Sequence, residues 1–200
     1  MKYHQFLSLP FLLLLLGNFY CIYYFTTHAN GFDTVIWIYW SQSMIIGLFN
    51  FLDLLTVKNF DANDLKINGQ PMQKGKNGCA AFFFLFHYGM FHLVYFIFIA
   101  TRLGLQSAIS KVVLIGILLF LVESLVSFLY RKRMEQTRTI NYGVLFILPY
   151  LRIIPMHIFI MIPVFMGIGG SILFLILKFI ADILSFISYG RLFKKNLTAR

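Results

Sequence analysis

Charged residues are scarce in this chain. Lys, Arg, Asp and Glu together make up 12% of its 200 residues, whereas soluble domains carry about 25%. Hydrophobic residues make up 60%, Phe alone fills 24 positions, and the mean hydropathy is +0.79. A soluble domain of this length has too little interior to bury so much apolar surface. The composition therefore excludes a soluble enzyme, a nucleic-acid-binding domain and a disordered chain, and it predicts a polytopic membrane protein.

Cysteine is rare, and the motifs of common catalytic sites are missing. The two cysteines, Cys21 and Cys79, fall in opposite halves of the bilayer in the spans assigned below, too far apart to form a disulfide. The sequence contains no C-x-x-C-H, H-E-x-x-H or G-x-S-x-G motif. Standard motifs for haem attachment, zinc proteases or serine hydrolases therefore give no support to an enzyme.

Long apolar segments are what the chain has in abundance. A helix needs about 20 mostly apolar residues to cross the hydrocarbon core of a bilayer. Six segments meet this requirement, namely residues 6–25, 34–57, 79–100, 110–130, 142–166 and 169–189. The polar stretch 58–78 predicts a loop or a small surface hairpin. The predicted fold class is all-α, a polytopic transmembrane helical bundle with six spans that forms one integral membrane domain over residues 1–200.

The positive charges predict how this bundle is oriented. Of the 17 Lys and Arg residues, 13 fall on the side of the membrane that holds both termini and the loop 58–78. Positive charge marks the cytoplasmic side, so both termini and this loop are predicted to be cytoplasmic. The basic loops can also attract anionic lipid headgroups. Because orientation accounts for the net charge of +10, this charge does not indicate a nucleic-acid partner.

Polar side chains within the spans are the candidates for function, because they are costly in hydrocarbon. They are Ser43, Asn50, Asp53, His87, His92, Glu123, Arg152, His157, Lys178 and Asp182. Lys178 and Asp182 lie one helical turn apart and can form an ion pair. Glu123 and Arg152 lie roughly 10 Å and 15 Å above the inner surface, so a bridge between them would neutralise both charges. A catalytic role is an alternative for Glu123, Ser43 and Asp53.

The three histidines allow three interpretations. Each can form hydrogen bonds to polar side chains of other helices and so hold the bundle together. Alternatively, His87, His92 and His157 could converge on one zinc ion that keeps a fourth position for water. His87 and His92 are five residues apart and do not share a helical face, so this site would need an irregular turn near Gly89. In the third interpretation, His92 and His157 ligate a haem.

The sequence contains the strings WSQSMIIGLFN (40–50), FHYGMFHLVY (86–95) and RIIPMH (152–157). Together they resemble an uncharacterised family of small bacterial integral membrane proteins that is described only as a domain of unknown function. The resemblance covers nearly the whole chain. It implies a six-helix protein of the bacterial inner membrane, and it assigns no reaction and no functional residue.

Three functions are compatible with the sequence. The first is a membrane-embedded structural or ligand-binding bundle with a buried cluster of His, Glu and Arg, which the short loops and missing motifs favour. The second is a zinc-dependent intramembrane enzyme, such as a hydrolase, that uses His87, His92 and His157. The third is a small transporter, because two three-helix halves would have opposite orientations, as in inverted repeats. The two halves show no clear sequence similarity, which weakens the third.

Overall fold

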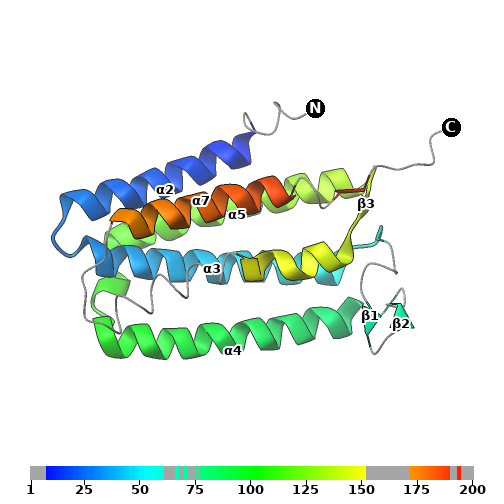
Figure 1. Ribbon diagram of the computed structural model, residues 1–200, viewed down its shortest axis with the longest axis horizontal. Helices are drawn as coiled ribbons and strands as arrows, with labels where there is room; N and C mark the ends of the chain where they lie inside the picture. Colours follow the sequence, from blue (N-terminus) through cyan, green and yellow to red (C-terminus); the bar gives the residue numbers. More distant parts are fainter. Residues whose placement is uncertain are drawn as a thin grey trace.

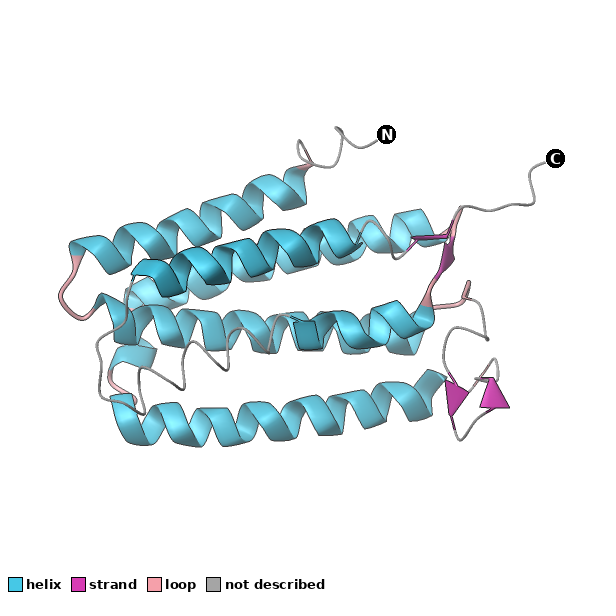
Figure 2. Ribbon diagram, viewed as in Figure 1, coloured by secondary structure: helices cyan, strands magenta, loops and turns pink. Residues whose placement is uncertain are grey.

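The computed structural model describes residues 8–60, 66–67, 70–71, 75, 77–151, 172–189 and 193–194. These residues form a bundle of long helices (Figure 1, Figure 2). The α-helices are α2 (Leu9–Thr27), α3 (Gly31–Thr56), α4 (Asn77–Leu103), α5 (Lys111–Glu135), the short helix Tyr142–Leu151 and α7 (Ile172–Tyr189). All of these except Tyr142–Leu151 are long and apolar enough to cross a membrane.

These five helices match the first, second, third, fourth and sixth predicted spans. The fifth predicted span begins with the helix Tyr142–Leu151, and its remaining residues, 152–166, lie outside the described residues. The largest difference is at the end of the fourth span, where α5 continues past Tyr130 to Glu135. The helix can continue because Arg131 and Lys132 form ion pairs with Asp53 of α3. Arg131 and Lys132, which the predicted spans leave in a loop, thus belong to helix α5.

The helices alternate in direction. The ring centroids of Phe11 and Phe186 are 5.2 Å apart, which places the start of α2 beside the end of α7. The ends of α3 and α5 meet through Asp53 and Arg131. We call the end of the bundle that holds Asp53, Arg131 and Glu135 the polar end. At the opposite end, the start of α3 meets the start of α7.

Two pairs of two-residue strands lie in the connections and the tail. β1 (Lys66–Ile67) pairs antiparallel with β2 (Gln70–Pro71), which gives the predicted polar stretch a short hairpin. β3 (Thr139–Ile140) pairs antiparallel with β4 (Phe193–Lys194), and Ile140 also bridges to Phe60. The segments that follow α3, α5 and α7 are therefore joined at the polar end.

Helix α3 lies at the centre of the bundle and packs against α2, α4 and α5. Its residues Val35, Ile36, Ile38 and Tyr39 are fully buried. Glycines allow its neighbours to approach closely, as is common between membrane helices. Ile38 packs over Gly116 of α5 in this way, and Tyr88 of α4 packs over Gly47 of α3.

We expect Gly47→Ala to destabilise the protein by about 1–3 kcal/mol, because the added methyl group overpacks the interface of α3 and α4. A Cβ atom at this position would overlap Cε1 of Tyr88. The ring cannot easily move aside, since its hydroxyl donates to the Ser43 carbonyl at 2.8 Å. Unfolding in mixed micelles, followed by circular dichroism, measures the change. Gly89→Ala on α4 is the matched control, because that position is open, and equal losses in both variants would contradict the prediction.

Candidate functional site: a polar pocket beside two buried networks

The second half of α5 carries three polar side chains spaced one helical turn apart, Glu123, Ser127 and Arg131. A spacing of four residues advances about 6 Å along a helix and keeps side chains on one face. This face turns into the bundle, where Glu123 is 3% exposed and Arg131 is 9% exposed. The Glu123 carboxylate accepts hydrogen bonds from Ser127 at 2.9 Å and from Ser124 at 3.2 Å. Helix α5 therefore presents an acceptor and a cation to the bundle interior.

A pocket of about 90 Å³ lies against this face of α5. Helices α2, α3 and α7 supply its other walls, with Ser8 and Pro10 at the start of α2, Ile46 and Phe49 on α3, and Phe186 and Tyr189 on α7. Arg138, which follows α5, also lines it. The pocket thus combines apolar walls with polar groups, most of which belong to α5 or to Arg138 after it.

The guanidinium group of Arg131 is held from two directions. Its Nε donates to Oδ2 of Asp53 at 2.7 Å, and its Cζ lies 4.9 Å from the centre of the Tyr189 ring. Lys132 Nζ lies 3.5 Å from the other oxygen of Asp53. The hydrogen bond to Asp53 uses Nε, and the two terminal amino groups of Arg131 make no hydrogen bond with another described residue.

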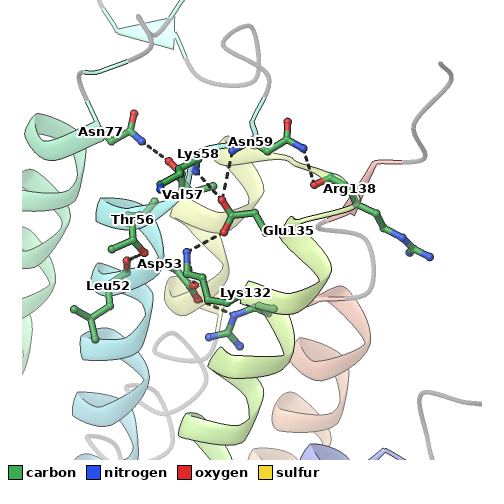
Figure 3. Close-up of polar contacts among 12 residues, drawn as sticks. Leu52, Asp53, Thr56, Val57, Lys58, Asn59, Asn77, Lys132, Glu135 and Arg138 are labelled. Carbon is green, nitrogen blue, oxygen red and sulfur yellow. Dashed lines mark hydrogen bonds and ion pairs between the residues drawn. The ribbon is translucent and has the colours of Figure 1, made fainter. Parts of the chain in front are cut away.

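Glu135 lies at the polar end, close to Asp53 and Lys132, as Figure 3 shows. Its carboxylate accepts hydrogen bonds from the backbone amides of Lys58 and Asn59, at 2.6 Å and 3.4 Å, and from Lys132 Nζ at 3.0 Å. The side-chain amide of Asn59 donates to the Arg138 carbonyl at 3.2 Å. These bonds fix the start of the loop after α3 to the last turn of α5.

A second network lies inside the bundle between α2, α3 and α7. Lys178 forms an ion pair with Asp182, which confirms the pairing predicted from their spacing, and it also donates to Oε1 of the Gln42 side chain. Asp182 Oδ2 accepts from Asn18 at 3.1 Å and from Gln42 at 3.2 Å. Lys178 Nζ lies 4.0 Å from the centre of the Tyr39 ring. Buried charges with such a complete set of partners join three helices.

A third set of contacts joins α3 to α4 around His92. Nδ1 of His92 bonds to the Tyr88 carbonyl at 2.9 Å, and Nε2 lies 2.8 Å from Ser43 Oγ. A carbonyl only accepts, so Nδ1 carries the proton, and in a neutral ring Nε2 accepts from the Ser43 hydroxyl. A hydroxyl beside an oriented imidazole is what a serine nucleophile requires. Both side chains are buried between the helices, however, so the contacts bind α3 to α4.

The other predicted site residues are distributed over the bundle. His87 is exposed and bonds to the Tyr150 hydroxyl at 2.9 Å, so its partners differ from those of His92. Among the described residues, no group of three or more His, Cys, Asp and Glu side chains could hold a metal ion. His157 and Arg152 lie outside the described residues, so the three-histidine site, the haem site and the Glu123–Arg152 bridge stay predictions. Cys21 and Cys79 are both free, as expected.

Asn50 is the one predicted polar residue whose amide atoms both lack a partner among the described residues. Its side chain is 1% exposed, so it carries the cost of a buried and unpaired amide. The neighbours with which it shares a face of α3, Ser43 and Asp53, bond to α4 and to α5 respectively. This face of α3 is therefore buried but divided between contacts to two different helices.

Several residues of these networks were not among the predicted site residues, including Asn18, Gln42, Tyr88 and Arg131. Asn18 and Gln42 are polar residues within apolar spans, so the cost of burying an amide could have identified them. Tyr88 shares a helical face with His92, which the spacing of four residues indicates. Arg131 had no such indication, because a basic residue directly after an apolar span usually marks a loop.

Comparison with known proteins identifies one family. A model described as "Family of unknown function (DUF6498)" matches residues 2–196 of the chain. No curated protein and no solved structure matches this chain significantly.

Proposed function

The chain belongs to this family of unknown function (DUF6498), and from this premise we propose that it is a membrane-embedded bundle that binds an amphiphilic ligand in the pocket beside α5. The pocket carries the proposal, because it brings Glu123, Ser127 and Arg131 together with apolar walls. A few convergent polar groups in a mainly apolar cavity are typical of ligand sites. The polar groups would bind the head of the ligand, and the apolar walls would contact its hydrocarbon part.

We place this bundle in a bacterial inner membrane with both termini in the cytoplasm. Five apolar helices of sufficient length support several crossings. Helix α5 ends at the polar end, whereas α7 begins at the opposite end, which agrees with a further crossing between them at the predicted fifth span. Lys58, Lys132, Arg133 and Arg138 lie in or beside the last turns at the polar end, and positive charge favours the cytoplasmic side. These basic residues would also attract anionic lipid headgroups.

The zinc enzyme and the transporter have weaker support. Both ring nitrogens of His92 bond to groups of α3 and α4, so a metal would have to displace Ser43 or the Tyr88 carbonyl. Helices α2 and α3 are tied to α7 by the Lys178 network, which gives no indication of two halves that move against each other.

Filling the pocket tests the proposal. We expect native mass spectrometry to detect phospholipid bound to the wild-type protein, and we expect Ile46→Trp to abolish this binding, because the indole would occupy the cavity that Ile46 lines. Leu48→Trp is the matched control, since Leu48 lies on the same helix and is 50% exposed. The proposal is wrong if Ile46→Trp folds and binds as much lipid as Leu48→Trp, or if the wild-type protein binds none.

A further inference from the structure

The pocket beside α5 has two arginines at the polar end of the bundle and an apolar wall further inside. We propose that it binds an anionic phospholipid by its phosphate, with Arg131 and Arg138 at the phosphate and the acyl chains on the side of the hydrocarbon core. The inference rests on the proposed ligand pocket and names the class of its ligand. It follows from the position of these cations along the bundle and from the partners that they already have.

Arg138 is the more accessible of the two arginines. It follows α5, lines the pocket and is half-buried. Its side chain makes no ion pair with a described residue, and Figure 3 shows its guanidinium directed away from Glu135. A guanidinium that lines a pocket without a carboxylate beside it is suited to form two parallel hydrogen bonds with a phosphate.

Arg131 adds a second guanidinium to the wall of the pocket, where it is only 9% exposed. Asp53 accepts from its Nε, and its terminal amino groups make no hydrogen bond with another described residue. Because the ion pair already holds the side chain, little conformational entropy remains to be lost when an anion binds. Tyr130, the preceding residue, also lines the pocket and is 49% exposed. The site is therefore accessible from outside the bundle at the level of Arg131.

The apolar wall lies on the hydrocarbon side of the arginines. Ile46 precedes Asp53 by seven residues on α3. On α7, Phe186 precedes by three residues the Tyr189 ring that contacts Arg131. At 1.5 Å per residue, Ile46 and Phe186 stand about 10 Å and about 5 Å further into the bundle. A phosphate at Arg131 would thus lie at the headgroup level of the proposed orientation, and the acyl chains would extend from it past the apolar wall.

The Glu123 carboxylate at the far end of the pocket keeps the anion at the arginines. Glu123 precedes Arg131 by eight residues on α5, which places it about 12 Å further into the bundle. It accepts hydrogen bonds from Ser124 and Ser127. A carboxylate at this depth repels a phosphate, so the phosphate stays at the polar end and no group of the ligand has to reach Glu123.

The charge around the phosphate favours a lipid with a net negative charge. Among the described side chains of the polar end, basic residues outnumber acidic ones. They are Lys58, Arg131, Lys132, Arg133 and Arg138, against Asp53 and Glu135. This excess attracts the phosphate of phosphatidylglycerol, whose glycerol headgroup is neutral. In phosphatidylcholine the trimethylammonium group lies outward of the phosphate in the same positive field, so attraction and repulsion nearly cancel.

Two synthetic lipids with identical acyl chains test the inference. Delipidated full-length protein is titrated with phosphatidylglycerol or phosphatidylcholine, and bound lipid is measured by native mass spectrometry. We expect phosphatidylglycerol to bind about fivefold more tightly, the effect of one basic side chain on an anionic lipid. Arg138→Gln should remove most of this preference by weakening the binding of phosphatidylglycerol. Arg131→Lys keeps the charge beside Asp53 but loses the paired donors of the guanidinium, so it should also weaken the binding of phosphatidylglycerol.

Arg133→Gln is the matched control for surface charge, because Arg133 is exposed on the same helix and does not line the pocket. It removes the same charge as Arg138→Gln and should leave the preference intact. Equal binding of the two lipids would overturn the inference. An equal loss of preference in Arg133→Gln and Arg138→Gln would also overturn it, because the preference would then come from the basic surface as a whole.

Two further measurements identify which proposal fails. Glycerol 3-phosphate carries the phosphate without acyl chains, and in excess it should not displace bound phosphatidylglycerol; displacement would show that the site takes a soluble phosphate, against the inference. If the two lipids bind equally and Ile46→Trp abolishes that binding, the ligand pocket stands and only its preference for anionic lipid is wrong. If Ile46→Trp has no effect, the ligand pocket falls as well.

Discussion

Lys178→Met is expected to lower the free energy of unfolding by about 3–5 kcal/mol, because it leaves the carboxylate of Asp182 buried without its cation. Lys178 and Asp182 are both buried between α2, α3 and α7. The amides of Asn18 and Gln42 would still donate to Asp182, but they carry no charge to balance it. The change would also remove the contact of the ammonium group with the Tyr39 ring.

A double variant distinguishes the loss of the ion pair from a simple packing defect. Lys178→Met with Asp182→Leu removes both charges, so we expect it to recover more than half of the stability that Lys178→Met loses. Full recovery is not expected, since the amides of Asn18 and Gln42 would lose their partners. Ile180→Met on the exposed face of α7 is the control and should unfold like the wild type. The explanation fails if the double variant is less stable than Lys178→Met.

Asp53→Asn should cost about 3 kcal/mol, because it leaves Arg131 buried and facing a neutral amide. The ion pair joins the last turn of α3 to Arg131 near the end of α5, and its shortest contact is 2.7 Å. Lys132 also loses its contact with Asp53 but keeps the one with Glu135 at 3.0 Å. The variant should therefore loosen the polar end while the Lys178 network stays intact.

Asp33→Asn is the matched control, because Asp33 lies in the first turn of the same helix and makes no ion pair with a described residue. It should cost at most about 1 kcal/mol, the usual value for a charge at a helix terminus. A double-mutant cycle with Arg131→Met then isolates the pairwise term, and a coupling energy near zero would refute the role of the ion pair. Unfolding in mixed micelles, followed by circular dichroism, is the measurement for all of these variants.

The sequence predicted much more of the fold than of the site. Each of the five long helices begins and ends close to a predicted span, because the length and hydropathy of a membrane helix are local properties. Charge was a poorer guide at the end of α5, where Arg131 was assigned to a loop. A local pattern contains no information about Asp53, which comes 78 residues earlier in the chain and allows the helix to continue.

For the site, spacing along one helix predicted contacts within that helix but not between helices. It predicted the Lys178–Asp182 pair correctly, since both residues lie on one turn of α7. It could not show that Asn18 and Gln42 complete this pair, or that Ser43 meets His92. It also gave no indication that Glu123 and Arg131 line one pocket with residues of α2, α3 and α7.

The sequence by itself determined the class of the molecule, a bundle of apolar helices, because the bilayer sets the length and composition of each crossing. Only the tertiary structure decided which polar side chains meet. Helices in lipid gain little from burying apolar surface against one another, so small residues, ion pairs and hydrogen bonds choose their neighbours. Gly47 beneath Tyr88, Asp53 beside Arg131 and Lys178 beside Gln42 are contacts of this kind. The pocket beside α5 exists because such contacts set α2, α3, α5 and α7 around one polar face.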